Sequence, residues 1–190
     1  MLQHAFKEWA IICRALAEGR QAVILRKGGV AEVGNVFQPD HSRFWLYPTF
    51  AHQQEQGVKP AGETLLRAAG QDKPGQGLVR FTHFVEVPGV YQVGNLDDAL
   101  ALDALHLWTP ATVRQRFEYR QPGLYVLPAR VWRAAQAFEL IETPAYAGCK
   151  SWVELEQGLP TEGATPVLDD VAFREVVRQI EAILNPTALA

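Results

Sequence analysis

The sequence has little of what marks several common protein classes. Its 190 residues include only two cysteines, Cys13 and Cys149, which are too far apart in sequence to suggest a disulfide framework or a zinc knuckle. No run approaches the roughly 20 apolar residues of a membrane-spanning helix. The N-terminal stretch carries Lys7, Glu8 and Arg14, unlike the apolar centre of a signal peptide. These absences predict a soluble protein of the reducing cytoplasm with no membrane partner.

An excess of positive charge and the familiar phosphate-binding motifs are also missing. The net charge of −3 argues against coating nucleic acid by overall attraction, although a local basic groove is compatible with it. Neither G-x-x-x-x-G-K-[ST] nor G-x-G-x-x-G occurs, and the G-x-S-x-G elbow of serine hydrolases is absent. A nuclease of the common restriction core needs an Asp followed by Glu-x-Lys or Asp-x-Lys to hold a divalent metal. Neither Glu154 nor Glu156 is followed by a lysine two residues later. We therefore expect no metal site and no cofactor.

The composition that remains is that of an ordinary globular protein. With 48% hydrophobic and 21% charged residues, the chain suits one domain over residues 1–190. Apolar residues at three- and four-residue spacing predict an N-terminal helix from His4 to Glu18. Thr109 and Pro110 predict the start of a central helix that exposes most of its arginines, including Arg116. A third helix is expected over residues 169–185, after a linker over residues 158–166.

Strand signals fill most of the remaining chain. The runs that read as strands or hairpins are 21–30, a turn at 33–36, 43–47 ending at Pro48, a hairpin over 78–93, 124–132 and a strand ending near Leu155. Residues 54–77 are rich in Gln, Gly and Pro and are expected to form a mobile surface loop. The sequence thus predicts an α+β fold, with a mixed, mostly antiparallel sheet of short strands and hairpins flanked by an N-terminal, a central and a C-terminal helix.

A first group of candidate ligand-binding residues follows the buried run at 22–25. Arg26 and Lys27 bring positive charge to the end of this strand, and Gly28 and Gly29 allow backbone amides to approach an anion. Because successive strand residues point to opposite faces, the two cations face apart unless the glycines bend the chain. A basic strand end followed by a glycine turn is the alternative reading.

A second group lies near the end of the 43–47 strand. Tyr47, Thr49, His52 and Gln53 come close together in sequence, and Thr49 is expected to cap a short helical turn. The pKa of histidine suits acid–base chemistry, so His52 is a candidate catalytic residue, with a hydrogen-bonded structural role as the alternative.

A third group is carried by the C-terminal half. Cys149 follows a glycine and precedes Lys150, whose charge favours a thiolate, so Cys149 is a candidate nucleophile and Lys150 a candidate ligand-binding residue. Together with Trp45 and Tyr47, Trp108 is a candidate for stacking on nucleic-acid bases.

Several motifs resemble an uncharacterised bacterial family, the domain of unknown function 1802. They are FKEWA at Phe6, ALAEG at Ala15, LRKGG at Leu25, LYPTFAHQ at Leu46, LWTP at Leu107 and YAGCKSW at Tyr146. The resemblance extends from Ala5 to Leu155. It implies a role near restriction-modification or DNA metabolism, and a restriction-endonuclease-type partner, because the family is associated with a domain of that type.

Three functions remain open on the sequence. The first is a module that binds DNA, RNA or a phosphorylated small molecule through the basic candidates. The second is a small metal-independent enzyme that uses His52 and Cys149. The third is a structural or partner-binding subunit, which a large exposed apolar patch would indicate.

Overall fold

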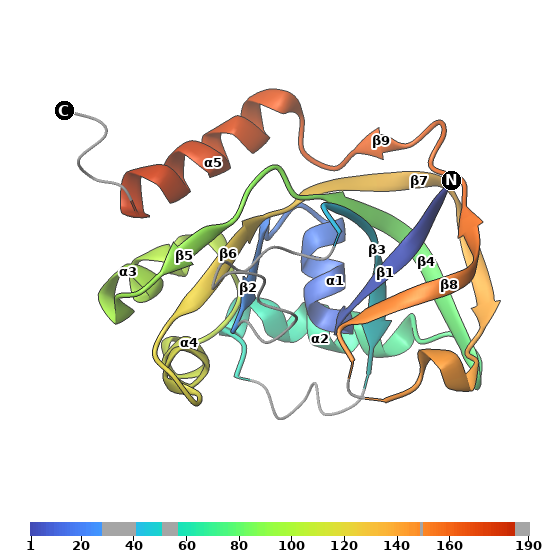
Figure 1. Cartoon of the computed structure of the whole chain (residues 1–190), viewed down its shortest axis with the longest axis horizontal. Helices are drawn as coiled ribbons and strands as arrows, with labels where there is room; N and C mark the ends of the chain where they lie inside the picture. The colour runs from blue at the N-terminus through green and yellow to red at the C-terminus, as the bar shows by residue number, and fades with distance from the viewer. Residues whose placement is uncertain (28–40, 51–56, 149, 185–190) are drawn as a thin grey trace.

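The larger sheet of the protein has six strands and includes the N-terminal residues of the chain. The structure, a computed structural model, describes residues 1–27, 41–50, 57–148 and 150–184. The strands follow in the spatial order β8 (Trp152–Leu159), β1 (Leu2–Trp9), β3 (Arg43–Thr49), β4 (Leu78–Glu86), β7 (Arg130–Ile141) and β9 (Thr165–Pro166). β1 and β3 run parallel, while the other neighbouring pairs are antiparallel (Figure 1). The parallel pair brings the ends of β1 and β3 to the same edge.

A second, smaller sheet stands beside the first. Its order is β2 (Val23–Arg26), β6 (Leu124–Pro128) and β5 (Tyr91–Val93), with both pairs antiparallel. The chain passes from β6 through Ala129 directly into β7, so one continuous stretch joins the two sheets.

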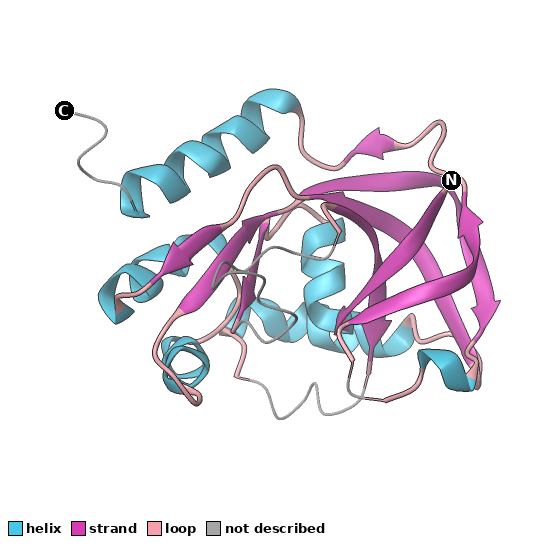
Figure 2. Cartoon of the chain, viewed as in Figure 1, coloured by secondary structure: helices cyan, strands magenta, loops and turns pink. Residues whose placement is uncertain are grey.

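The helices lie beside and between the two sheets. They are α1 (Ala10–Ala17), α2 (Pro60–Gln71), α3 (Leu96–Ala101), α4 (Pro110–Glu118) and α5 (Asp170–Leu184), with 3-10 turns η2 (Leu102–Leu105) and η3 (Pro144–Tyr146). Figure 2 shows α1 between the two sheets and α5 on the side of β5 and α3. The predicted α+β class and the mixed, mostly antiparallel sheet are confirmed. No helix in the described ranges is long and apolar enough to cross a membrane.

Alternation along β3 explains why the large sheet has a core on each face. Phe44 and Leu46 belong to the core that also holds α1 and β2, whereas Trp45 and Tyr47 belong to a second core with β4 and β8. The sequence predicted this division of faces, because successive strand residues point in opposite directions. The strand nevertheless continues through Pro48 to Thr49, so its predicted end at Pro48 is wrong.

The N-terminal helix is shorter than the sequence predicted. Residues Leu2–Trp9 form β1, and the helix begins only at Ala10. Apolar spacing at Phe6 and Trp9 fits a helix as well as a strand, but backbone pairing with β3 and β8 decides in favour of the strand. Cys13 lies on the buried side of α1, as predicted.

Two segments predicted to be irregular contain regular elements. The expected loop over 54–77 contains α2, which begins at Pro60 and packs its buried Leu65 and Ala69 on the side of α1. The expected linker over 158–166 contains the end of β8 and the short strand β9, which pairs with Trp132 and Arg133 of β7. Packing against neighbours, which local composition does not reveal, orders both segments.

Three strand predictions also need correction. β2 is buried on both faces as expected, but it lies at the end of its sheet rather than in the centre. β4 and β5 belong to different sheets, so they do not form the predicted hairpin. The predicted strand over 124–132 is divided at Ala129 into β6 and β7. The hairpin turn predicted at 33–36 lies outside the described residues.

Two helix starts with local capping signals, those of α3 and α4, were predicted correctly. Thr109 Oγ1 accepts from the backbone N–H of Thr112 at 3.2 Å, and Pro110 is the first residue of α4. Asn95 Oδ1 accepts from Asp97 N at 2.9 Å and caps α3. The C-terminal helix α5 begins at Asp170, within the predicted range, and buries Phe173 and Ile180.

Candidate functional site

A large groove opens beside the ends of the parallel strands β1 and β3. Its volume is about 1520 Å³, and α1, the α2–β4 connection and the segment around Gly148 form its walls. Trp9 of β1 pairs with Thr49 of β3, and both residues line the groove. The strand ends therefore place side chains from two distant parts of the sequence at one site.

Positive charge predominates in this groove. Six of its described lining residues are basic and three are acidic, namely Lys7, Arg14, Lys73, Arg80, Arg133 and Lys150 against Glu18, Asp72 and Glu142. The whole chain has the opposite balance, with a net charge of −3. The groove is thus a cationic region in an acidic protein.

Only some of these basic residues are neutralised by carboxylates. Arg14 pairs with Glu18 at 2.8 Å and also contacts Asp72, and Arg80 pairs with Glu139 at 2.7 Å. Within the described ranges, Lys73, Arg133 and Lys150 form no ion pair with a carboxylate. These three side chains are exposed, so they supply the charge that an anion entering the groove would meet.

The rim of the groove around Gly148 is held by lysines. Lys7 Nζ donates to the carbonyls of Tyr146 and, at 3.1 Å, Gly148, and it lies 5.3 Å from the centre of the Tyr47 ring. Lys150 Nζ donates to the carbonyl of Ala145. Gly148 has a φ of +87°, which a residue with a side chain rarely adopts. The two lysines thus fix the carbonyls of this turn.

Tyr47 and Thr49 are fixed by hydrogen bonds. The Tyr47 hydroxyl donates to Glu142 Oε1 at 2.6 Å, and burial together with this carboxylate raises the pKa of Tyr47. Thr49 Oγ1 donates to the carbonyl of Glu8 at 3.1 Å, so Thr49 joins the two parallel strands. The helical turn that Thr49 was predicted to cap falls on residues 51–56, which lie outside the described residues.

His83 adds a neutral imidazole to the groove wall. Burial lowers its pKa to about 4, with a further contribution from Arg133. Its Nδ1 is 2.8 Å from Thr82 Oγ1, and its buried Nε2 has no hydrogen-bond partner among the described residues. At neutral pH His83 therefore contributes no positive charge.

A second group of charges, which we call the arginine cluster, lies next to Trp9. It comprises Glu8, Arg26, Arg116 and Ser151, with the rings of Phe6, Trp9 and Trp108. Arg26 lies 4.6 Å from the Phe6 ring centre and donates to Ser151 Oγ. Arg116 lies 4.0 Å from the Trp108 ring centre and 4.7 Å from that of Trp9.

The arginine cluster is largely buried, which changes the acidity of its members. Burial lowers the pKa of Arg26, and it lowers the pKa of Arg116 to about 10, while the Glu8 carboxylate acts against both shifts. The charge of Arg26 lowers the pKa of Arg116 further. The expectation that Arg116 lies on the exposed face of its helix is therefore wrong, because α4 turns this side chain toward β1 and β2.

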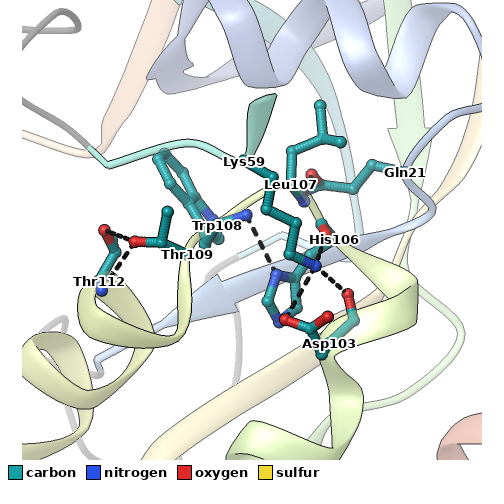
Figure 3. A network of polar contacts seen from close by, with 8 residues as sticks. All are labelled: Gln21, Lys59, Asp103, His106, Leu107, Trp108, Thr109 and Thr112. Atoms are coloured by element: carbon teal, nitrogen blue, oxygen red, sulfur yellow. Dashed lines mark hydrogen bonds and ion pairs between the residues drawn. The ribbon is translucent and has the colours of Figure 1, made fainter. Parts of the chain in front are cut away.

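A polar network holds the turn that presents Trp108 and α4 (Figure 3). Lys59 Nζ pairs with Asp103 at 2.9 Å and donates to the carbonyl of His106 at 2.9 Å. Gln21 Oε1 accepts from Leu107 N at 3.1 Å, and His106 Nδ1 accepts from Trp108 N at 3.2 Å. These bonds fix the start of α4 and hence the position of Arg116.

The structure separates Arg26 from Lys27, as alternation along a strand requires. Arg26 enters the arginine cluster, whereas Lys27 Nζ donates to the carbonyls of Phe117, at 2.7 Å, Gly123, at 2.9 Å, and Gln121. These carbonyls lie at and beyond the end of α4, where a cation is favourable. The described contacts of Lys27 are thus those of a residue that caps a helix.

The aromatic candidates are buried. Trp45 and Trp108 are 0% and 1% exposed, and Tyr47 is 2% exposed, so none offers an open ring face for stacking on a base. Of the other candidates, Thr49 and Lys150 line the groove. Gly28, Gly29, His52, Gln53 and Cys149 lie outside the described residues.

Sequence reasoning missed Lys7, Trp9, Phe50 and Arg116. Trp9 and Phe50 are partly exposed groove residues, and the Nζ of Lys73 lies 5.6 Å from the Phe50 ring centre. The FKEWA motif contains the first two residues, but its assignment to a helix hid the strand end on which they meet β3.

The fold and the groove define an α+β protein with a cationic site at the ends of two parallel strands. The chain belongs to the family described as domain of unknown function DUF1802, which matches residues 5–179. No curated protein matches the sequence.

Among solved structures, the chain resembles the ASCH protein of Zymomonas mobilis. A serine-to-alanine variant is 10% identical, with 92% of this chain and 94% of that chain covered and a TM-score of 0.48. A tyrosine-to-phenylalanine variant is 13% identical, with 94% and 98% covered and a TM-score of 0.47. A further structure of that protein is 13% identical, with 92% and 93% covered and a TM-score of 0.43.

Proposed function

We propose that the groove binds a single strand of nucleic acid, DNA or RNA, through its phosphates. The reversal of charge carries the proposal, because the described lining has six basic and three acidic residues in a chain of net charge −3. An anionic strand is attracted to such a groove and repelled by the acidic protein as a whole. This arrangement favours binding at one site over coating of the surface.

The size of the groove favours a strand over a small phosphorylated molecule. Its volume of about 1520 Å³ exceeds the roughly 300–1,000 Å³ of typical small-molecule pockets. Trp9 and Phe50 are partly exposed residues of its walls, and aromatic rings accept stacked bases with little regard to sequence. Thr49, Lys73, Arg133 and Lys150 are the polar residues that we assign to the strand.

The other candidates keep their sequence-based roles as proposals. His52, Gln53, Gly28 and Gly29 adjoin segments that reach the groove or the arginine cluster, and Cys149 precedes Lys150. An enzymatic function of His52 and Cys149 is supported by sequence alone. The link to restriction-modification, with a restriction-endonuclease-type partner, rests on the family resemblance.

The partner-binding alternative receives little support from the surface. Large exposed apolar side chains in the described part of the chain are Met1, Tyr119, Ile141 and Val171, and they come from separate elements. Scattered apolar residues of this kind are normal on a protein surface.

Fluorescence anisotropy with a labelled oligonucleotide tests the proposed function. At low salt the protein should bind single-stranded DNA or RNA, and the double substitution Lys73→Glu with Lys150→Glu should weaken binding by about tenfold or more. The control is Arg114→Glu on α4, because Arg114 is exposed and does not line the groove. Absence of binding by the unaltered protein, or an equal loss in the control, would refute the proposal.

A further inference from the structure

The arginine cluster holds more positive than negative charge among side chains that are largely but not fully buried. Arg26 comes from β2 and Arg116 from α4, yet the Glu8 carboxylate acts on both guanidiniums. Glu8 is itself 6% exposed, and its Oε1 accepts from Trp9 N at 2.9 Å. In the part of the chain that is described, no other carboxylate acts on either arginine. Two largely buried cations with one anion are costly unless a further anion joins them.

The geometry of both guanidiniums leaves hydrogen-bond donors available. A guanidinium has five N–H groups, and its flat face can rest on an aromatic ring while its edge binds an acceptor. Phe6 takes the face of Arg26, and Trp108 and Trp9 contact Arg116. The acceptors among the described residues are Ser151 Oγ for Arg26 and, at 3.4 Å, the Leu25 carbonyl for Arg116.

Among the described residues, no nitrogen of either arginine is a buried polar atom without a partner. Arg26 and Arg116 are both partly exposed, so the cluster is not sealed from solvent. The aromatic contacts hold the guanidiniums in place before any ligand arrives. An anion would therefore meet donors that are already oriented.

A phosphate monoester fits this cluster better than a carboxylate does. It carries nearly two negative charges at neutral pH and three strong acceptor oxygens. Two guanidinium edges and the Ser151 hydroxyl can satisfy all three oxygens, whereas one carboxylate would be satisfied by a single guanidinium. A dianion also neutralises the positive charge of the two arginines that remains after the single negative charge of Glu8 is counted.

The cluster adjoins the groove through Trp9. This residue lines the groove, and its ring centre lies 4.7 Å from the Arg116 guanidinium. Two neighbours of the cluster also line the groove, since Thr49 donates to the Glu8 carbonyl and Lys150 precedes Ser151. A strand that occupies the groove therefore runs close to the arginines.

We propose that the arginine cluster binds the terminal phosphate of the strand that occupies the groove. This inference rests on the proposed nucleic-acid function and adds that the protein recognises a phosphorylated end. Arg26 and Arg116 hold the phosphate oxygens, Ser151 donates to one of them, and Glu8 keeps the two guanidiniums charged and oriented.

The test compares one oligonucleotide in three forms, with a 5′-phosphate, with a 3′-phosphate and with hydroxyl groups at both ends. Isothermal titration calorimetry at constant ionic strength should show one phosphorylated form binding about tenfold or more tightly than the hydroxyl form. Inorganic phosphate should compete with that form and leave binding of the hydroxyl form unchanged. Arg26→Lys and Arg116→Lys keep the charge but remove the forked edge, so each should abolish the preference.

The possible outcomes distinguish a failure of end recognition from a failure of strand binding. Equal binding of all three forms would overturn the end recognition and leave strand binding intact, whereas no binding of any form would overturn both. A preference that survives in both lysine variants would overturn the assignment to these arginines. If either variant fails to fold by circular dichroism, the comparison of the three forms and the phosphate competition still decide with the unaltered protein.

Discussion

Salt should weaken the binding of a strand to the groove by an amount that the groove itself determines. Three described basic residues, Lys73, Arg133 and Lys150, line it without a carboxylate partner. For single strands, the logarithm of the binding constant falls with the logarithm of salt concentration by about 0.7 for each neutralised phosphate. If each residue neutralises one phosphate, the slope is about −2.1, and affinity falls about twentyfold between about 50 and 200 mM salt.

Single substitutions make this prediction residue-specific. Lys150→Gln should reduce the slope to about −1.4, which corresponds to about a sevenfold loss over the same range. Arg114→Gln is the matched control, because it removes a cation that forms an ion pair with Glu118 at 3.8 Å outside the groove. Anisotropy titrations of an oligonucleotide with hydroxyl ends, at four or more concentrations of potassium chloride, measure each slope.

Two results would refute this reasoning. A slope near zero for the unaltered protein would mean that phosphate contacts do not drive binding. An equal change of slope in Lys150→Gln and Arg114→Gln would mean that net charge, and not the groove, attracts the strand.

Three further predictions concern buried or capping groups. Lys27→Met should lower the free energy of unfolding in urea by about 2 kcal/mol, because Lys27 caps α4, and anisotropy should show unchanged strand affinity. Burial lowers the pKa of His106 to about 4 in the folded protein. In the unfolded chain His106 has the ordinary pKa of about 6.5, so it binds a proton there at a higher pH than in the folded protein. The contribution of His106 to stability should therefore fall by about 2 kcal/mol from about pH 6.5 to 4.5. His106→Asn, which can still accept from Trp108 N, should remove this loss in urea unfolding at the two pH values; an unchanged loss would contradict the assignment. Burial, then Glu8, raises the pKa of the Cys13 thiol, so mass spectrometry should find it alkylated by iodoacetamide only in urea.

Local signals allowed the caps and the face pattern to be predicted from sequence. Thr109 and Asn95 act on backbone groups two or three residues away, so their effect is visible in a short stretch. The alternation from Phe44 to Tyr47 is equally local, and its two faces enter two cores as predicted. The existence of these elements follows from neighbours in sequence.

Distant partners explain what the sequence did not reveal. Residues 2–9 form a strand because β3 and β8 pair with them, and nothing within the stretch itself excludes a helix. In α2, Gly62 weakens the helical signal, but a Cβ there would lie 3.3 Å from that of Val58, so close packing favours the glycine. Arg116 enters the arginine cluster only because Trp9, Trp108 and Leu25 converge from three distant parts of the chain.

The direct passage from β1 into α1 makes the length of the N-terminal stretch as important as its composition. Trp9 ends the strand and is also the N-cap of the helix, so no loop separates the two elements. Deleting one residue between Ala5 and Trp9 would exchange the two faces of β1, or else turn α1 by about 100° about its axis. Substitutions here change single contacts, whereas an insertion or deletion would move Cys13 and Arg14 off the groove wall together. Homologues should therefore vary in the residues of this stretch while keeping its number of residues.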